Sequence, residues 1–139
     1  MLLEFTVENF RSFRGKTTLS MIASSDNSLL HNLSRNEVIN DKRTVNSAVI
    51  YGANASGKSN LIIAMTILRN FIINSHAHQK GIRLNHQPFA FDEDHIKMPT
   101  RFTISFIQDN IRYDYSMAYD KERIVEERLN YYPNGKISM

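Results

Sequence analysis

Residues 47–65 of the 139-residue chain read SAVIYGANASGKSNLIIAM, in which glycine and small polar residues separate two apolar runs. Residues 52–59 match the pattern G-x-x-x-x-G-K-[ST] at every fixed position. The apolar run at 48–51 is typical of a central strand buried on both faces. From residue 58 to about 74, apolar side chains recur every three or four positions, which predicts a largely buried helix. The stretch therefore predicts a strand, a glycine-rich loop and a helix that begins at a lysine.

The loop has the composition of a site that wraps phosphate. Gly52 would let the chain leave the strand, and Gly57 would keep the backbone bare where a phosphate approaches. Asn54 and Ser56 would tolerate the unusual backbone angles that such a loop requires. The backbone amides from about residue 55 to residue 60 could then converge on one phosphate, with the positive end of the helix behind them.

Two side chains at the start of the helix carry the predicted chemistry. Lys58, the one catalytic candidate, would reach the β- and γ-phosphates, and Ser59 would place its hydroxyl on Mg²⁺. The predicted cofactors are therefore ATP and Mg²⁺, with the preference for ATP over GTP left open. An ordinary glycine turn is the alternative, but four matched positions with the correct flanks favour nucleotide binding. The predicted contact residues of the loop are Gly52, Asn54, Ala55, Ser56, Gly57, Lys58, Ser59 and Asn60.

The remaining segments predict mainly antiparallel strands. Residues 2–8 and 16–23, joined by a turn at 9–15, predict a hairpin whose first strand turns Leu3, Phe5 and Val7 to one face. Residues 24–46 predict a long polar loop with at most one short helix, and residues 86–99 an irregular segment. From about residue 101 to 139 the alternation predicts a meander, with turns at 109–110, 120–121 and 133–135 and a last strand that begins at 136.

Composition sets bounds without naming a function. The chain is long enough for one compact domain. It contains no run of about 18 apolar residues, so the sequence predicts no membrane span. The N-terminus does not have the pattern of a signal peptide. The absence of cysteine rules out disulfides and fits a reducing, cytoplasmic location. A net charge of +3 permits phosphate-rich partners, although a solvated surface is the commoner reason for surplus lysine and arginine.

Two motifs give the sequence a family resemblance. LLEFTVENFRSF at residues 2–13 and GANASGKSNL at 52–61 resemble the ABC-type ATPases of the RecF, SMC and OLD (overcoming lysogenisation defect) group. The meander after PFAFDED resembles the OLD-like bacterial AAA-family ATPases, several of which act in anti-phage or abortive-infection systems beside a nuclease or other effector. The resemblance covers most of the chain. It implies an α/β P-loop NTPase fold, with residues 1–139 forming the N-terminal lobe of an ABC-type ATPase head whose C-terminal half is absent.

The same resemblance implies further site residues and partners. Arg11 would approach the nucleotide phosphates, and Ser12 and Phe13 would lie near the base or sugar. The alternative is that Phe10 and Phe13 are core residues and that Arg11 is a solvated turn charge. The implied partners are a second copy of the ATPase and an effector nuclease or DNA-processing protein; nucleic-acid contact stays open, and no membrane is involved.

Several parts of an ABC-type hydrolysis site have no match in the sequence. No Ser-Gly-Gly signature occurs, and FAFDE at 89–93 fits a surface acidic turn better than a Mg²⁺-holding strand. Gln79, Gln87 and Gln108 are candidates for the Mg²⁺-sensing glutamine by residue type alone. ATP hydrolysis is therefore expected of a full-length protein. The alternatives are a RecF/SMC-like ATPase of DNA repair and a nucleotide- or partner-binding fragment without turnover.

Three other patterns favour ordinary structural roles. His76 and His78 lie two residues apart without a convincing third metal ligand, so a polar helix exit is the preferred interpretation. The charged residues at 122–128 fit the solvated side of a strand pair. The tyrosines near Arg112 could stack on bases but are more often packing residues of strands; they are Tyr113, Tyr115, Tyr119, Tyr131 and Tyr132.

Overall fold

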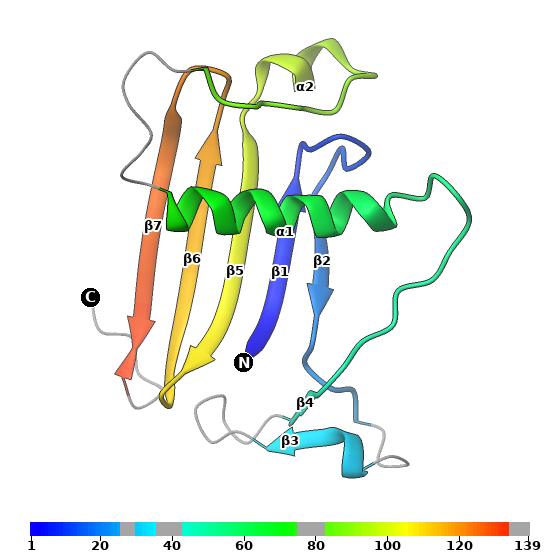
Figure 1. Cartoon of the computed structure of the whole chain (residues 1–139), viewed down its shortest axis with the longest axis vertical. Coiled ribbons are helices and arrows are strands. Elements are labelled where there is room, and N and C mark those ends of the chain that lie inside the picture. Colours follow the sequence, from blue (N-terminus) through cyan, green and yellow to red (C-terminus); the bar gives the residue numbers. More distant parts are fainter. Residues whose placement is uncertain (26–29, 36–42, 75–82, 134–139) are drawn as a thin grey trace.

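The computed structural model describes residues 1–25, 30–35, 43–74 and 83–133. In this part of the chain a five-stranded antiparallel sheet has the order β2-β1-β5-β6-β7, and helix α1 (Lys58–Ile73) crosses one face of it (Figure 1). The strands are β1 (Leu2–Glu8), β2 (Thr17–Ser20), β5 (Thr100–Gln108), β6 (Ile111–Tyr119) and β7 (Ile124–Tyr132). A second sheet pairs β3 (Leu33–Arg35) with β4 (Arg43–Val45), after the short 3-10 helix η1 (Leu30–Asn32). Helix α2 (Glu93–Lys97) precedes β5.

The predicted N-terminal hairpin and the meander are confirmed in the described residues. β1 pairs antiparallel with β2, and β5, β6 and β7 pair antiparallel in sequence order. The β5–β6 turn places Asp109 and Asn110 at φ 51° and 59°, left-handed angles that a tight hairpin requires and that these residue types tolerate. β1 lies between β2 and β5, so the first strand of the chain is an interior strand of the sheet.

The core lies between α1 and the sheet. Phe5 and Val7 of β1 pack with Phe102 of β5 and Met117 of β6, and all four are fully buried. The buried helix residues recur at three- and four-residue intervals, as one face of a helix must; they are Leu61, Ala64, Leu68 and Phe71. Leu3 is buried like Phe5 and Val7, as the predicted alternation requires, and beside the register shift between Leu2 and Glu4 it packs in a separate cluster with Ile107.

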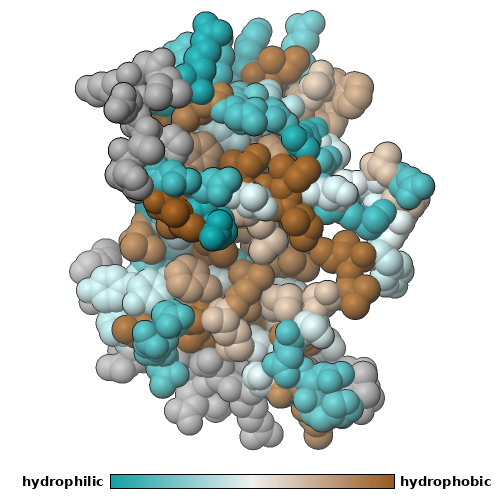
Figure 2. Space-filling view, in the orientation of Figure 1, coloured by the Kyte–Doolittle hydropathy of each residue, from teal (hydrophilic) through white to brown (hydrophobic). Residues whose placement is uncertain are grey.

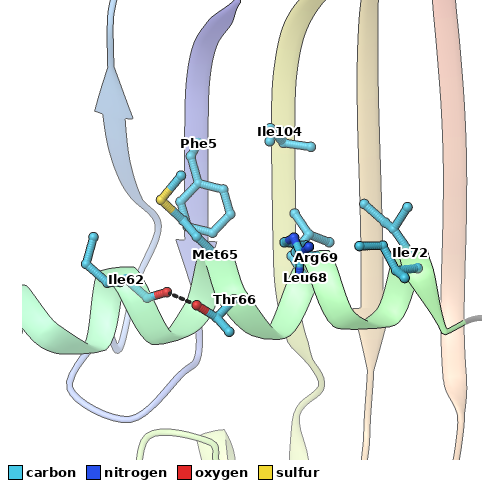
Figure 3. A pocket seen from close by; sticks show the side chains of 9 residues that line it. Phe5, Ile62, Met65, Thr66, Leu68, Arg69, Ile72 and Ile104 are labelled. Carbon is cyan, nitrogen blue, oxygen red and sulfur yellow. Dashed lines mark hydrogen bonds between the residues drawn. The ribbon is translucent and has the colours of Figure 1, made fainter. Parts of the chain in front are cut away.

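The apolar residues on the other sides of α1 correct the prediction of a largely buried helix. Ile62, Ile72 and Ile73 are about half exposed. Beside the helix an apolar groove of about 550 Å³ is lined by Phe5 and Ile104 of the sheet and by residues of α1 (Figure 3). Figure 2 shows hydrophobic side chains gathered on this face of the molecule. The single helix covers only part of the sheet, which is why the wide apolar stripe of its sequence stays partly in contact with solvent.

The predicted buried strand at 48–51 is wrong for this structure. No strand is assigned there, and Val49 and Tyr51 are 85% and 90% exposed. A strand needs a hydrogen-bonded neighbour, and in the described residues no strand pairs with this segment. All strand pairs of the described residues are antiparallel.

Two small elements were missed. The β3–β4 hairpin lies inside the predicted loop at 24–46; its strands of three residues each are too short for alternation to show. Helix α2 lies inside the predicted irregular segment, and its Asp92-Glu93-Asp94 start is a recognisable N-cap signal.

Residues 75–78 and the last predicted strand at 136–139 lie outside the described residues. Among the described helices, none is long and apolar enough to cross a bilayer.

Candidate functional site

The loop at residues 52–59 joins the exposed segment 47–51 to the first turn of α1 (Figure 1). Its left-handed residues are Ala55, at φ 63°, and Gly57, at φ 95°. The prediction that Asn54 and Ser56 take the unusual angles is therefore wrong, since the strained positions are the two that follow them. Gly52 has no such angle, although a Cβ there would lie 3.1 Å from Ser56 Oγ.

The side chain of Lys58 lies back over its own loop. Its Nζ donates hydrogen bonds of 2.7 Å to the carbonyl of Gly52 and 2.6 Å to the carbonyl of Ala53, with Ser56 Oγ at 3.4 Å. Among the described residues Lys58 forms no ion pair. Carbonyl oxygens orient the ammonium without neutralising its charge, so the lysine stays available to an anion in the loop.

The N-terminus of α1 has no side-chain cap. Gly57 occupies the N-cap position, and the first turn contains no acidic residue. Helix α2 shows the usual solution, since Asp92 caps it by accepting a hydrogen bond from the Asp94 amide and Glu93 and Asp94 lie in its first turn. The positive end of the 16-residue α1 is thus left without the anionic groups that normally stabilise a helix start.

The turn at residues 9–14 packs directly against this loop. A Cβ on Gly57 would lie 2.8 Å from Ser12 Oγ and 3.6 Å from the Phe13 ring. Asn60, in the first turn of α1, donates to Ser12 Oγ at 2.9 Å. Gly57 is therefore required twice, by its backbone angle and by the close approach of this turn. The structure brings Ser12, Phe13 and Asn60 together with the loop, and their contact with a nucleotide stays a prediction.

Arg11 joins this turn to both α1 and the segment before α2. Its Nε donates to Gln87 Oε1 at 2.5 Å, and its Nη1 donates to Asn60 Oδ1 at 3.2 Å. Its guanidinium also lies 5.5 Å from the centre of the Phe10 ring. Phe10 is fully buried, so the core interpretation holds for it, while the partly buried Phe13 packs both on the core and beside Gly57. Arg11 is partly buried and fixed, not a freely solvated charge.

Asn9 organises the turn, and sequence reasoning missed it. Its buried Nδ2 donates to the carbonyls of His95, Met98 and Pro99, and its Oδ1 accepts from the Phe89 amide. It also takes a left-handed φ of 51°. Asparagine is the residue type that combines this angle with both donors and an acceptor, and its position at the start of the NFRSF motif could have signalled the role.

The acidic turn at 89–93 is a surface feature, in agreement with its preferred interpretation. Asp92 caps α2, pairs with Arg14 at 2.7 Å and lies 3.0 Å from His95 Nδ1. The hydrogen bond from Arg14 is the main cause that lowers the pKa of Asp92. Residue 91 is a strongly exposed phenylalanine, and no strand forms at 89–92.

The candidate glutamines and tyrosines divide between separate places. Gln87 contacts Arg11, Gln108 lies at the far end of β5 beside Asp109, and Gln79 lies outside the described residues. Tyr132 stacks under Arg112, whose pKa is raised chiefly by its hydrogen bond to Asp114. The other tyrosines do not share that surface: Tyr119 is buried in the core, Tyr113 stacks on Phe106, Tyr115 bonds Glu127, and Tyr131 is half exposed.

The partly buried His86 packs against the buried Tyr119. The rings of His86 and Tyr119 are 5.7 Å apart, edge to face. Burial raises the pKa of Tyr119 to about 12, with Arg11 acting in the opposite sense. Burial also lowers the pKa of His86, against the opposing charge of Asp120. Both groups are therefore neutral near pH 7, and they add no negative charge beside the guanidinium.

These residues fit a phosphate group better than a metal held by the protein alone. The uncapped helix start carries Lys58, and the neighbouring turn at 9–14 carries Arg11; neither side chain forms an ion pair in the described residues. Ser59, exposed in the first turn, is the one predicted Mg²⁺ ligand. In the described ranges no group of three or more His, Cys, Asp or Glu side chains could hold a metal ion. A Mg²⁺ ion would thus come with the phosphates it neutralises.

Comparison with known proteins places the loop in a family context. Residues 47–139 match the family model described as "AAA domain, putative AbiEii toxin, Type IV TA system". The match begins just before the loop and includes α1 and the meander. A search of curated proteins finds no match for the chain.

Proposed function

The chain belongs to this family of AAA domains, a nucleotide-binding, ATPase-type group, and on that premise we propose that it binds Mg·ATP as the N-terminal lobe of an ABC-type ATPase. The single observation that carries the proposal is the left-handed Gly57 at the uncapped start of α1, followed by Lys58. Backbone amides at a glycine-rich helix start, with a lysine beside them, are a common way for proteins to bind phosphate groups.

Five of the predicted contact residues receive a specific role in this proposal. Lys58 exchanges the carbonyls of Gly52 and Ala53 for the β- and γ-phosphates, and Ser59 supplies a hydroxyl to Mg²⁺. Arg11 adds a second positive charge from the neighbouring turn. Ser12 and Phe13, in contact with Gly57, lie on the path of the sugar or base.

The wider role follows from the resemblance and from the family description. We propose that a second copy of the ATPase completes the hydrolytic site and that ATP-driven engagement regulates an effector nuclease or a DNA-processing protein in the bacterial cytoplasm. The family description names a toxin of a toxin–antitoxin system, which supports a role in phage defence or growth control. A RecF/SMC-like role in DNA repair is the alternative, with the same nucleotide chemistry and a different partner.

Calorimetric titration of the chain with Mg·ATP and Mg·GTP tests the proposal. The wild-type chain should bind saturably, and Lys58→Ala should weaken binding roughly 10- to 100-fold, because hydrogen bonds to charged groups contribute about 1.5–3 kcal/mol. Lys97→Ala, at an exposed lysine at the end of α2, is the matched control and should bind like wild type. Equal binding by wild type and Lys58→Ala would show that the loop does not hold the phosphates.

A further inference from the structure

We propose that Gln87 is a positioning residue of the nucleotide site: with Asn60 it forms an uncharged clamp that holds the Arg11 guanidinium beside the loop with its positive charge unneutralised. The inference rests on the proposed function and extends it to a residue outside the loop and outside the matched motifs. It names the segment before α2 as part of the site.

The clamp is made of four successive contacts. Asn85 Oδ1 accepts from Gln87 Nε2 at 2.7 Å, and Gln87 Oε1 accepts from Arg11 Nε. Arg11 Nη1 donates to Asn60 Oδ1, and Asn60 Nδ2 donates to Ser12 Oγ. The backbone adds a further bond, from the Arg11 amide to the Gln87 carbonyl at 2.9 Å. Arg11 is thus gripped on two sides by amide oxygens, and the network ends at the serine that touches Gly57.

The chemistry of the gripping groups distinguishes Arg11 from other arginines of the chain. Arg14, Arg101 and Arg112 each pair with a carboxylate, of Asp92, Glu126 and Asp114. Arg11 bonds two carboxamides, and no ion pair involves it in the described residues. A carboxamide fixes the direction of a guanidinium as a carboxylate does but leaves the net charge in place.

The position of the clamp indicates a function for the positive charge that Arg11 retains. Asn60 is the third residue of α1, so the guanidinium lies beside a helix start that is itself positive and uncapped. Lys58 begins the same helix, with its Nζ over the carbonyls of Gly52 and Ala53. A bound triphosphate would supply the anion that this helix start lacks, and a clamp that holds Arg11 in advance would lower the entropic cost of binding.

Two substitutions separate positioning from a merely structural role. Gln87→Met keeps the size of the side chain but removes the acceptor, and it should weaken Mg·ATP binding about threefold. Gln87→Glu keeps the grip but neutralises Arg11, and it should weaken binding roughly tenfold, because the arginine would then be paired as in the other three cases. The midpoint of thermal unfolding should stay near that of wild type for Gln87→Glu. Gln108→Met and Gln108→Glu, at the end of β5, are matched controls that should bind like wild type.

A double-mutant cycle in calorimetric titrations decides the matter. In an Arg11→Ala background, Gln87→Met should cause no further loss of Mg·ATP affinity, since the clamp would have nothing to hold. An additional loss equal to that in the wild-type background would overturn the proposal, and so would unchanged affinity in both Gln87 variants. If the wild-type chain itself bound no nucleotide, the proposed function would fail first, which the same titration shows before any variant is compared.

Discussion

At the scale of single residues, Gly57 connects the loop, the helix and the N-terminal turn. Its φ of 95° lies where side chains are strained, and a Cβ would lie 2.8 Å from Ser12 Oγ. We expect Gly57→Ala to lower the free energy of unfolding by about 1–3 kcal/mol, as is usual for strained backbone positions. Gly15→Ala is the control, because nothing lies within 4 Å of its Cβ position. Urea denaturation of both variants measures the difference, and equal stabilities would show that the left-handed angle is not required.

His86 makes stability depend on pH. Burial lowers its pKa below the ordinary value of 6.5, despite the nearby carboxylate of Asp120. Between the lowered pKa of the folded state and the ordinary pKa of the unfolded state, the unfolded chain therefore binds more protons than the folded chain. The contribution of His86 to the free energy of unfolding is complete above pH 6.5 and is lost as the pH falls through the pKa of the folded state. Denaturation curves between pH 7.5 and 5.5 should show falling stability in wild type and a shallower fall in His86→Gln. If stability fell equally with pH in wild type and in His86→Gln, groups other than His86 would cause the pH dependence.

At the scale of elements, Asn9 ties the N-terminal turn to the segment that carries Gln87 and α2. Its side chain makes four hydrogen bonds at a position that is 1% exposed. Asn9→Gly, which tolerates the left-handed angle, should lose about 1–3 kcal/mol of unfolding free energy through unsatisfied buried groups. Asn9→Ala should lose more, because it adds backbone strain. Chemical denaturation tests the order, and a Gly variant as stable as wild type would contradict this anchoring role of Asn9.

The elements also show what the sequence could and could not predict. α1 and the strands of the meander were predicted because their apolar residues recur with clear periods over nine or more residues. The segment at 48–51 was predicted wrongly as a buried strand, since an apolar run indicates burial only when a partner strand is present, and here the segment is exposed. The β3–β4 strands were too short to show a period.

At the scale of the whole molecule, the fold places sequence-distant residues around one loop. The turn at 9–14, which follows β1, lies against the first turn of α1 through the bond from Arg11 to Asn60. Gln87, in the segment before α2, contacts the same arginine. The loop itself could be predicted because its spacing is a fixed pattern. The contact of Gln87 with Arg11 could not be predicted, since the two residues lie 76 positions apart in the sequence and only the three-dimensional structure brings them together. Asn9 was missed for the same reason, because its partners lie 80 or more positions away.

The apolar groove beside α1 lies apart from this chemistry, because no loop residue lines it. The most direct test of the central claim is therefore a map of backbone amide chemical shifts in the wild-type chain during titration with Mg·ATP. The account predicts large, saturable shifts for amides of residues 53–60 and 11–13, with the amides of β7 unchanged. Shifts confined to residues that line the groove, such as Met65 and Ile104, with none in the loop, would contradict it.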